Sequence, residues 1–235
     1  MYRKKMRFYP ALVCVMLLLI VGPGFSQTGQ DSRQNTARPD ALRSYRIGRD
    51  LEARDRMDEA NQYYNEAIRI CMDEIAQNAA NMDSYTVLTW TLQRQRKYSD
   101  VIIWGERGLR INANDYRIVE TMGEAYFYLN RFEDSLRCMQ RYVNFLPQGE
   151  RSSVAYFFIG EIFRLQQKFH RADIAYTTAV RLEPNAALWW YRLGSVRESM
   201  KEFSPAIEAY QRALRLNPAY REAAEGLERS RRNST

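Results

Sequence analysis

The residue types that most often carry out catalysis are few in this sequence and lie far apart. There is one histidine, His170, and no second histidine or cysteine pair stands at the spacing of a metal site. Glycine-rich phosphate loops and Gly-x-Ser-x-Gly turns are absent from the sequence. Carboxylates are numerous, and two could meet in space without leaving a pattern; Glu124 and Glu161 are the pair to test. The sequence therefore predicts a protein that is not an enzyme and binds no metal or cofactor, and leaves an enzyme with paired carboxylates as an alternative.

The histidine and the cysteines each have a structural interpretation. His170 falls in a predicted turn between two helices, where we expect a solvated side chain. Cys71 and Cys138 are separated by several predicted helices. Packed helices lie about 8 to 10 Å apart, so a disulfide between the two is out of reach. We expect both thiols to be free and Cys138 to be a small residue that faces the core.

A period of 34 residues defines the elements that position every other side chain. Gly160 and Gly194 are separated by this period, and six further pairs of like residues share it. The pairs are Phe169 with Phe203, Ala172 with Ala206, Tyr176 with Tyr210, Ala179 with Ala213, Leu182 with Leu216, and Pro184 with Pro218. Chance does not place seven pairs in one register, so the chain contains an internal repeat.

Each repeat is expected to be a hairpin of two amphipathic helices. In the copy at residues 187–220, two apolar stripes follow helical spacing, namely Trp190, Leu193, Val196 and Met200, then Ile207, Tyr210, Ala213 and Leu214. We expect Ser204 to cap the second helix and Pro205 to occupy its first position. Gly194 and Ala206 are small enough to let the helices approach closely. Such a hairpin cannot bury both stripes alone, so it must stack on other copies.

The repeat resembles the tetratricopeptide repeat at its marked positions. Where the family has Trp, Leu, Gly, Ala, an aromatic residue, Ala and Pro, this chain has Trp190, Leu193, Gly194, Ala206, Tyr210, Ala213 and Pro218. The resemblance implies an all-α fold, a right-handed superhelical solenoid of stacked antiparallel helix pairs. We expect five repeats, at residues 41–81, 82–115, 116–152, 153–186 and 187–220, and a capping helix with a basic tail at residues 221–235.

Two spacings depart from the period. Gly48 and Thr89, which stands in place of the glycine, are 41 residues apart. We expect the extra sequence at residues 70–81 to lengthen the second helix of the first repeat, and Asn81 to cap the next helix. Gly123 and Gly160 are 37 residues apart, which fits a longer turn near residues 147–150.

The first 26 residues have the pattern of a secretory signal peptide. Four cations between residues 3 and 7 precede an apolar run at residues 11–21, and small residues lead to Ser26, where we expect cleavage. An uncleaved membrane anchor is the alternative, since residues 8–25 are almost continuously apolar. Residues 27–40 are polar and are expected to form a disordered tether that ends in Asp40, a cap for the first helix. The pattern predicts export to the periplasm or cell envelope.

The net charge gives little support to nucleic-acid binding. The whole chain carries +7, and removal of the four cations of the signal lowers this to +3. Arg229, Arg231 and Arg232 form a short basic tail. We interpret it as a solubilising end of the capping helix rather than a contact with a membrane or an acidic partner.

The resemblance places the functional surface on the first helix of each repeat. In tetratricopeptide proteins these helices line a concave groove that holds an extended peptide or a partner helix. Residues at the matching positions are Tyr45, Arg49, Trp90, Arg94, Glu120, Glu124, Phe127, Tyr128, Phe157, Glu161, Arg164 and Tyr191. Aromatic side chains supply contact area and charges orient a bound segment, so this mixture is typical of a recognition surface.

The charged members of this set predict particular contacts. Glu124 and Glu161 are expected to bind a basic residue of a partner, and Arg94 and Arg164 a carboxylate each. Proteins that clamp the acidic tail of cytosolic chaperones have Lys and Asn at such positions, which this chain lacks, so that subclass is set aside.

The aromatic members have two interpretations. Packing between neighbouring repeats is an equal alternative to ligand contact for Phe127, Phe157 and Tyr191. Trp90 is favoured as a ligand contact because other residues of its helix supply the core.

The sequence favours an exported, non-enzymatic adaptor that binds partner proteins in the cell envelope, in the assembly of a larger complex. The alternative is a ligand-binding accessory subunit of an envelope transporter, with a small hydrophobic molecule held among Trp90, Phe127 and Phe157. The partner and the oligomeric state are not specified by the sequence.

Overall fold

The repeats fold as five pairs of helices followed by a single helix. The computed structural model describes residues 40–234, which contain eleven α-helices and no strand. The pairs are α1 (Ala41–Glu52) with α2 (Met57–Gln77), α3 (Met82–Arg94) with α4 (Tyr98–Ile111), α5 (Tyr116–Tyr128) with α6 (Phe132–Phe145), α7 (Ser152–Leu165) with α8 (Phe169–Leu182), and α9 (Ala187–Ser199) with α10 (Phe203–Leu216). Helix α11 (Arg221–Asn233) ends this series. The all-α solenoid predicted from the repeats is confirmed, whereas the predicted signal peptide and most of the predicted tether lie outside the described residues.

Two predicted caps are present at helix starts. The side chain of Asp40 accepts a hydrogen bond from the backbone N–H of Arg43 at 3.1 Å, and that of Asn81 accepts one from Ser84 at 3.4 Å. The extra sequence before Asn81 lengthens α2 to 21 residues, compared with 14 in α4 and α8. The insertion is therefore absorbed by one helix and leaves the pairing of the others unchanged.

The predicted cap of α10 is wrong. This helix begins at Phe203, its N-cap residue is Glu202, and no side chain caps it. Pro205 is thus the third residue of the helix, a position in the first turn where its missing N–H costs nothing. The start of α10 is determined by the turn before it, and Ser204 has no part in it.

Each hairpin turns through one residue with left-handed backbone. Asp55, Arg96, Asn130, Gln167 and Lys201 all have φ between 58° and 62°, and none is glycine. The N–H of the next residue then donates to a carbonyl five residues back, as from Lys168 to Phe163 at 2.8 Å and from Glu202 to Arg197 at 2.9 Å. This motif closes the first helix and directs the chain into the second, which explains why α10 starts where it does.

Glycine and tyrosine pack against each other where the two helices of a pair cross. A Cβ added at Gly160 would lie 2.7 Å from the ring of Tyr176, and one at Gly194 would lie 2.8 Å from the ring of Tyr210. Both tyrosines are fully buried. The period of the sequence therefore reflects a close contact that only glycine permits.

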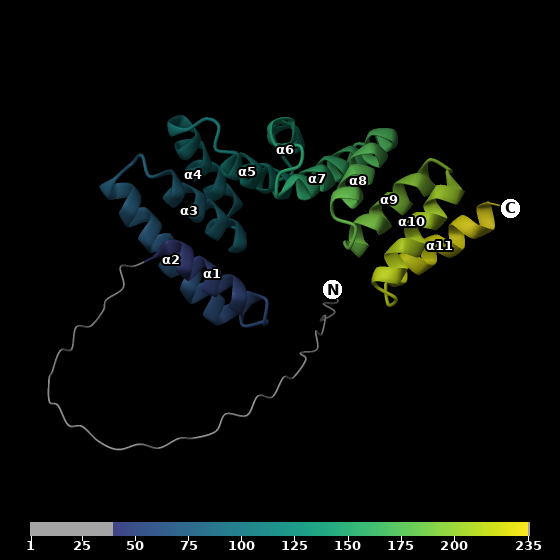
Figure 1. Cartoon of the computed structure of the whole chain (residues 1–235), viewed down its shortest axis with the longest axis horizontal. Coiled ribbons are helices and arrows are strands. Elements are labelled where there is room, and N and C mark those ends of the chain that lie inside the picture. The colour runs from purple at the N-terminus through teal and green to yellow at the C-terminus, as the bar shows by residue number, and fades with distance from the viewer. Residues whose placement is uncertain (1–39, 235) are drawn as a thin grey trace, which may run out of the picture. The chain divides into compact units, whose positions relative to one another are not determined.

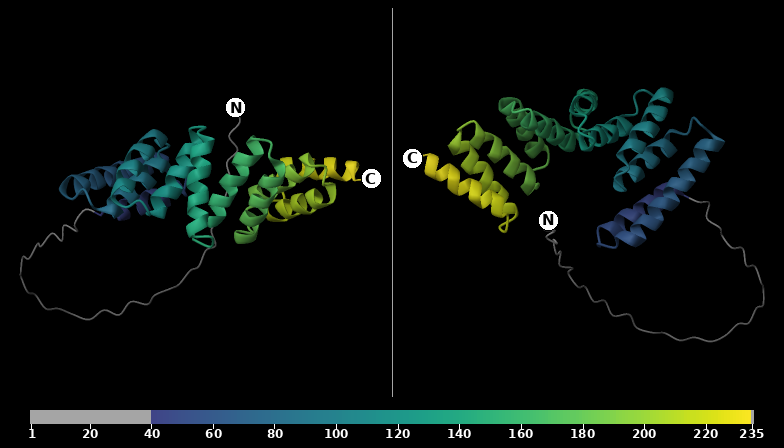
Figure 2. Two further views of the ribbon diagram at one scale, coloured as in Figure 1. Left: turned by 90° about the horizontal axis from the view of Figure 1, so that it is seen from above. Right: turned by 180° about the vertical axis from the view of Figure 1, so that it is seen from behind.

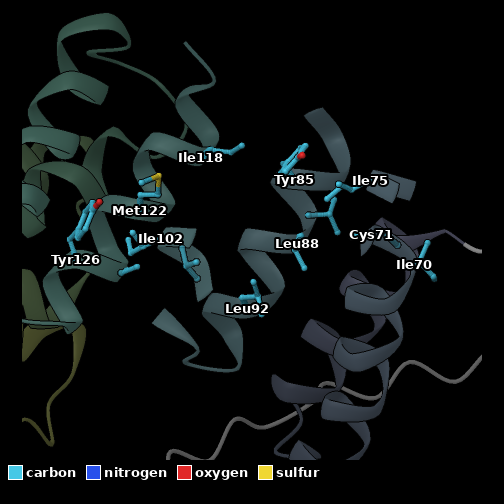
Figure 3. Close-up of a cluster of buried hydrophobic side chains, with 14 residues drawn as sticks. Ile70, Cys71, Ile75, Tyr85, Leu88, Leu92, Ile102, Ile118, Met122 and Tyr126 are labelled. Carbon is cyan, nitrogen blue, oxygen red and sulfur yellow. The ribbon is translucent and has the colours of Figure 1, made fainter. Parts of the chain in front are cut away.

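Two large hydrophobic clusters follow one another along the stack. The first includes Ile70, Leu88 and Ile118 and draws on helices α1 to α5 (Figure 3). The second includes Met139 and Phe158 and draws on α6 to α10. Because each cluster is built from the faces of successive helices, burial depends on neighbouring repeats rather than on one central core.

Contacts between the helices follow the order of the chain (Figures 1 and 2). Every helix packs on the next one, and some first helices of neighbouring pairs also touch: α1 with α3, α3 with α5, and α5 with α7. Among the helices that the structure describes, we find none with the length and apolar character needed to cross a bilayer.

Candidate functional site

The first helices of the five pairs carry all twelve predicted binding residues. They are Tyr45 and Arg49 on α1, Trp90 and Arg94 on α3, Glu120, Glu124, Phe127 and Tyr128 on α5, Phe157, Glu161 and Arg164 on α7, and Tyr191 on α9. Within each helix the members are three, four, seven or eight positions apart, except for the adjacent Phe127 and Tyr128, so they lie on one side of the helix or at its edge. We call the surface that these twelve residues form the first-helix face.

At the α1 end of this face, aromatic rings join the first pair to the second. The rings of Tyr45 and Trp90 lie 5.8 Å apart and are tilted by 33°. The guanidinium of Arg49 lies 5.9 Å from the centre of the Tyr45 ring. Trp90 is half-buried and packs against the first hydrophobic cluster. Packing between repeats thus occupies part of the ring that the sequence favoured as a ligand contact.

The other aromatic residues of the face also pack on neighbouring rings. Phe127 lies 5.0 Å from the ring of Phe158, and Phe157 stacks on Trp189 at 5.1 Å. Both belong to the second hydrophobic cluster, whereas Trp90 belongs to the first. The three rings predicted to hold a small hydrophobic molecule are therefore distributed over two clusters.

Three apolar side chains remain open to solvent on the first helices. Tyr128 is 50% exposed, Leu165 45% and Leu188 43%. Tyr128 stacks on Tyr98 with 4.8 Å between ring centres, which holds its ring in place. Leu165 and Leu188 were missed by the sequence analysis, although Leu165 follows Glu161 by four positions and Leu188 precedes Tyr191 by three, the spacing of one helix side.

Two carboxylates of α5 are buried and bind one arginine. Arg151, just before α7, donates from Nε to Glu120 at 3.0 Å and from Nη2 to Glu124. The side chain of Gln93 donates to the other oxygen of Glu124 at 2.5 Å. Burial, together with the nearby charge of Glu124, raises the pKa of Glu120 well above its ordinary value. The group that this pair of carboxylates holds is thus an arginine of the same chain.

Glu161 is likewise occupied by residues of this chain. The hydroxyl of Tyr176 donates to Oε1 at 2.5 Å, and Arg164 donates to Oε2 at 2.7 Å. Arg192, on α9, places its Nε 3.0 Å from Oε1. Burial and the adjacent Glu161 charge raise the pKa of the Tyr176 hydroxyl, which therefore stays protonated and donating.

The same arrangement recurs at both ends of the stack. Glu52 accepts from the hydroxyl of Tyr64 at 2.6 Å and from Arg94 at 2.9 Å. Glu198 accepts from Tyr210 at 2.6 Å and from Arg229 at 2.8 Å. In each case the tyrosine comes from the second helix of the same pair and the arginine from the helix that begins the next unit, so the carboxylate ties neighbouring units together.

Sequence reasoning missed the partners of these carboxylates. Glu52 precedes Tyr64 by twelve residues and Glu198 precedes Tyr210 by twelve, a regularity that could have revealed two of the networks. Arg151 follows Glu120 by 31 residues, Arg192 follows Glu161 by 31, and Arg229 follows Glu198 by 31, a second regularity that could have revealed these arginines.

The histidine and the two described cysteines lie outside the first-helix face. His170 is exposed on the first turn of α8, rather than in the turn before it. Cys71 and Cys138 are free thiols, and burial raises the pKa of Cys71 to about 12 and that of Cys138 to about 11. Within residues 40–234 no group of three or more metal-ligating side chains comes together.

An open hollow of about 490 Å³ lies at the α7–α8 and α9–α10 turns. It is lined by Gln167, Lys168, Phe169, His170, Arg171, Ser199 and Met200. None of the twelve residues of the first-helix face contributes to it.

Comparison with known proteins identifies the repeat. Residues 153–186 and 187–220 each match a family model described as the tetratricopeptide repeat (TPR). The peroxisomal targeting signal receptor of Kluyveromyces lactis is 30% identical over 95 residues, which cover 39% of this chain and 16% of that receptor. The chain thus spans less than a fifth of the length of this relative.

Solved structures share the fold at low sequence identity. TTC0263, a thermophilic TPR protein of Thermus thermophilus, has a TM-score of 0.60 at 17% identity over 81% of this chain and 98% of its own. YrrB, described as a TPR protein with an unusual peptide-binding site, has a TM-score of 0.56 at 16% identity over 81% of this chain and 93% of its own.

Proposed function

Because this chain is a tetratricopeptide-repeat protein, we propose that it is a non-enzymatic scaffold whose first-helix face receives an extended segment or a helix of a partner protein. The observation that carries the proposal is the presence of Tyr128, Leu165 and Leu188, each about half exposed, on three successive first helices. Exposed apolar side chains beside fixed charges are the composition of a protein-binding surface.

Two of the similar proteins support a peptide or a protein segment as the partner. The relative from Kluyveromyces lactis is named as a receptor for a targeting signal, and YrrB is described as having a peptide-binding site. A solenoid offers a long surface made of equivalent helices, which suits a ligand that is itself extended. The proposed partner is therefore a protein segment.

We propose that the scaffold acts in the cell envelope, where it assembles a larger complex. The pattern of residues 1–26, with cations before an apolar run and small residues before Ser26, supports export. An adaptor that leaves the cytoplasm with no catalytic motif acts through the partners it brings together.

A photo-cross-linking residue placed in the native protein tests this function. At position 128, on the first-helix face, we expect a covalent adduct with a partner protein in intact cells. At position 174 on α8, where Ile174 is 68% exposed, we expect none, although the apolar residue replaced is even more accessible. Replacement of Leu165 and Leu188 by serine should abolish the adduct at 128.

The same purified protein reports on export. A mass that corresponds to a chain beginning at Gln27 supports cleavage of the signal, and a mass that corresponds to a chain beginning at Met1 contradicts it.

The cross-linking experiment has its own contradicting outcome. An adduct at position 174 that survives the replacement of Leu165 and Leu188 would assign binding to the second helices and overturn the proposed face.

A further inference from the structure

On the first-helix face the negatively charged side chains are buried, and the positively charged side chains that cover them are more exposed. The side chains of Glu120, Glu124 and Glu161 are only 5%, 10% and 8% exposed. The guanidinium-bearing side chains that cover them are much more open, with 47% exposure for Arg151 and 31% for Arg192. The carboxylates therefore lie below the surface, and the charge that a partner meets is positive.

The covering arginines keep donors for a ligand. A guanidinium has five N–H groups, and the hydrogen bonds from Arg151 to Glu120 and Glu124 use two of them. Two N–H groups of Arg164 likewise donate to Glu161. Because each fork is anchored to a buried carboxylate, little side-chain entropy is lost when the free N–H groups bind an acceptor.

The excess positive charge is clearest where α7 meets α9. Glu161 is a single carboxylate with two arginines, Arg164 and Arg192, in contact with it. The Arg192 guanidinium also lies 5.6 Å from the centre of the Tyr191 ring. A further exposed arginine, Arg49, lies at the α1 end of the face.

A basic partner segment fits this surface poorly. To reach Glu161, a lysine of the partner would have to displace Arg164 or Arg192 while Tyr176 still occupies one oxygen. It would also bring a like charge beside the second arginine, which costs free energy in a partly buried site. The geometry thus opposes the contact that the sequence predicted for this carboxylate.

We propose that the partner segment is acidic and extended, with carboxylates that bind the exposed arginines and apolar side chains that contact Leu165, Leu188 and Tyr128. This inference rests on the proposed function and adds the chemistry of the partner. Arg164 and Arg192 are the principal anchor, and Arg151 and Arg49 extend the positive surface toward α1. Charge-assisted bonds to carboxylates are among the strongest available at such a surface.

Fluorescence anisotropy with the full chain and three matched synthetic peptides tests the proposal. The peptides share alternating phenylalanine and leucine residues and differ only in the intervening residues, which are glutamate, glutamine or lysine. We expect the glutamate peptide to bind about tenfold more tightly than the glutamine peptide, and the lysine peptide to bind most weakly. The affinity for the glutamate peptide should fall as salt is raised.

Two variants locate the effect. Arg192→Gln leaves Glu161 paired with Arg164 and Tyr176, so folding is retained, and should remove most of the preference for glutamate. Arg181→Gln makes the same charge change at an exposed position of α8 and should leave the preference for glutamate intact. Circular dichroism of each variant confirms the helical fold.

The possible outcomes distinguish the acidic partner from the proposed function on which it rests. Equal binding of the glutamate and glutamine peptides, lost in the Leu165→Ser and Leu188→Ser variant, would overturn the acidic partner and keep the binding face. A preference for glutamate that Arg181→Gln weakens as much as Arg192→Gln would reduce the effect to general attraction between charges and also overturn it. Failure of all three peptides to bind, together with no cross-linked adduct at position 128, would remove the proposed function itself.

Discussion

At the scale of single residues, five turns hold a non-glycine residue in a backbone region that glycine occupies most easily. Gln167 has a φ of 58° and Lys201 one of 62°. A side chain in this region costs about 1 to 2 kcal/mol because Cβ approaches the following carbonyl oxygen. The cost is accepted because the hydrogen bonds of the turn close one helix and start the next.

Gln167→Gly should therefore stabilise the protein. Relief of the strain outweighs the greater freedom that glycine gives the unfolded chain, for a net gain of about 0.5 to 1 kcal/mol. Chemical denaturation followed by circular dichroism measures the change. The adjacent Gln166, whose φ is −82°, is the control: Gln166→Gly should destabilise, and stabilisation by both variants would contradict the explanation.

Single residues also show how far the sequence could predict this site. The caps Asp40 and Asn81 were correctly predicted because an N-cap depends on residues within three positions. The cap at Ser204 was not, since the turn through Lys201 decides where that helix starts. Arg192, which contacts Glu161 on another repeat, was missed because such an ion pair depends on how two repeats stack. Its only trace in the sequence is a spacing of 31 residues, which Glu120 with Arg151 and Glu198 with Arg229 share.

At the scale of elements, the junction of α5 and α7 contains two buried carboxylates that share one arginine. Glu120 and Glu124 lie one turn apart on α5 and share Arg151, whose backbone N–H donates to the hydroxyl of Tyr142 on α6 at 3.2 Å. The period lengthens to 37 residues here, and the longer turn brings Arg151 over α5. An insertion that the sequence interpreted only as a turn thus supplies the counter-ion of a buried pair.

The raised pKa of Glu120 makes the stability of this junction depend on pH. Burial and the charge of Glu124 favour the protonated form in the folded state, so the folded chain binds a proton more tightly than the unfolded chain does. The contribution is complete below the ordinary pKa of glutamate and is lost as the pH rises through the raised value. Stability should therefore decline on the alkaline side of that range.

Glu120→Gln should remove this decline, because the amide imitates the protonated acid. We expect the thermal midpoint of the variant to equal that of the native protein at about pH 4 and to exceed it at about pH 8. Glu133→Gln, on the exposed surface of α6, controls for the change in net charge. Its thermal midpoint should change with pH as that of the native protein does. A variant less stable than the native protein at both pH values would show that Glu120 is ionised in the folded protein throughout this range.

At the scale of the whole molecule, stability should be local because burial is shared only between neighbours. The ring of Tyr210 packs on Gly194 from its own pair and on Gly226 from α11, where an added Cβ would also clash with the ring. Leu227 and Ala223 of α11 complete the cluster at this end. The five-repeat fold was predictable because the period encodes these contacts, and nothing in the period encodes which surface residues meet a partner.

Removal of residues 221–235 should accordingly loosen one end of the stack and leave the other unchanged. Without α11, Tyr210 loses the apolar surface that covers it, and Glu198 loses Arg229, which donates at 2.8 Å. We expect amide hydrogen exchange in α9 and α10 to accelerate by about tenfold or more, since each factor of ten requires only about 1.4 kcal/mol. Exchange in α1 to α4 should not change, because none of those helices packs against α11. Uniform acceleration along residues 40–220 would instead show one cooperative core, and the additive description by neighbouring repeats would then be wrong.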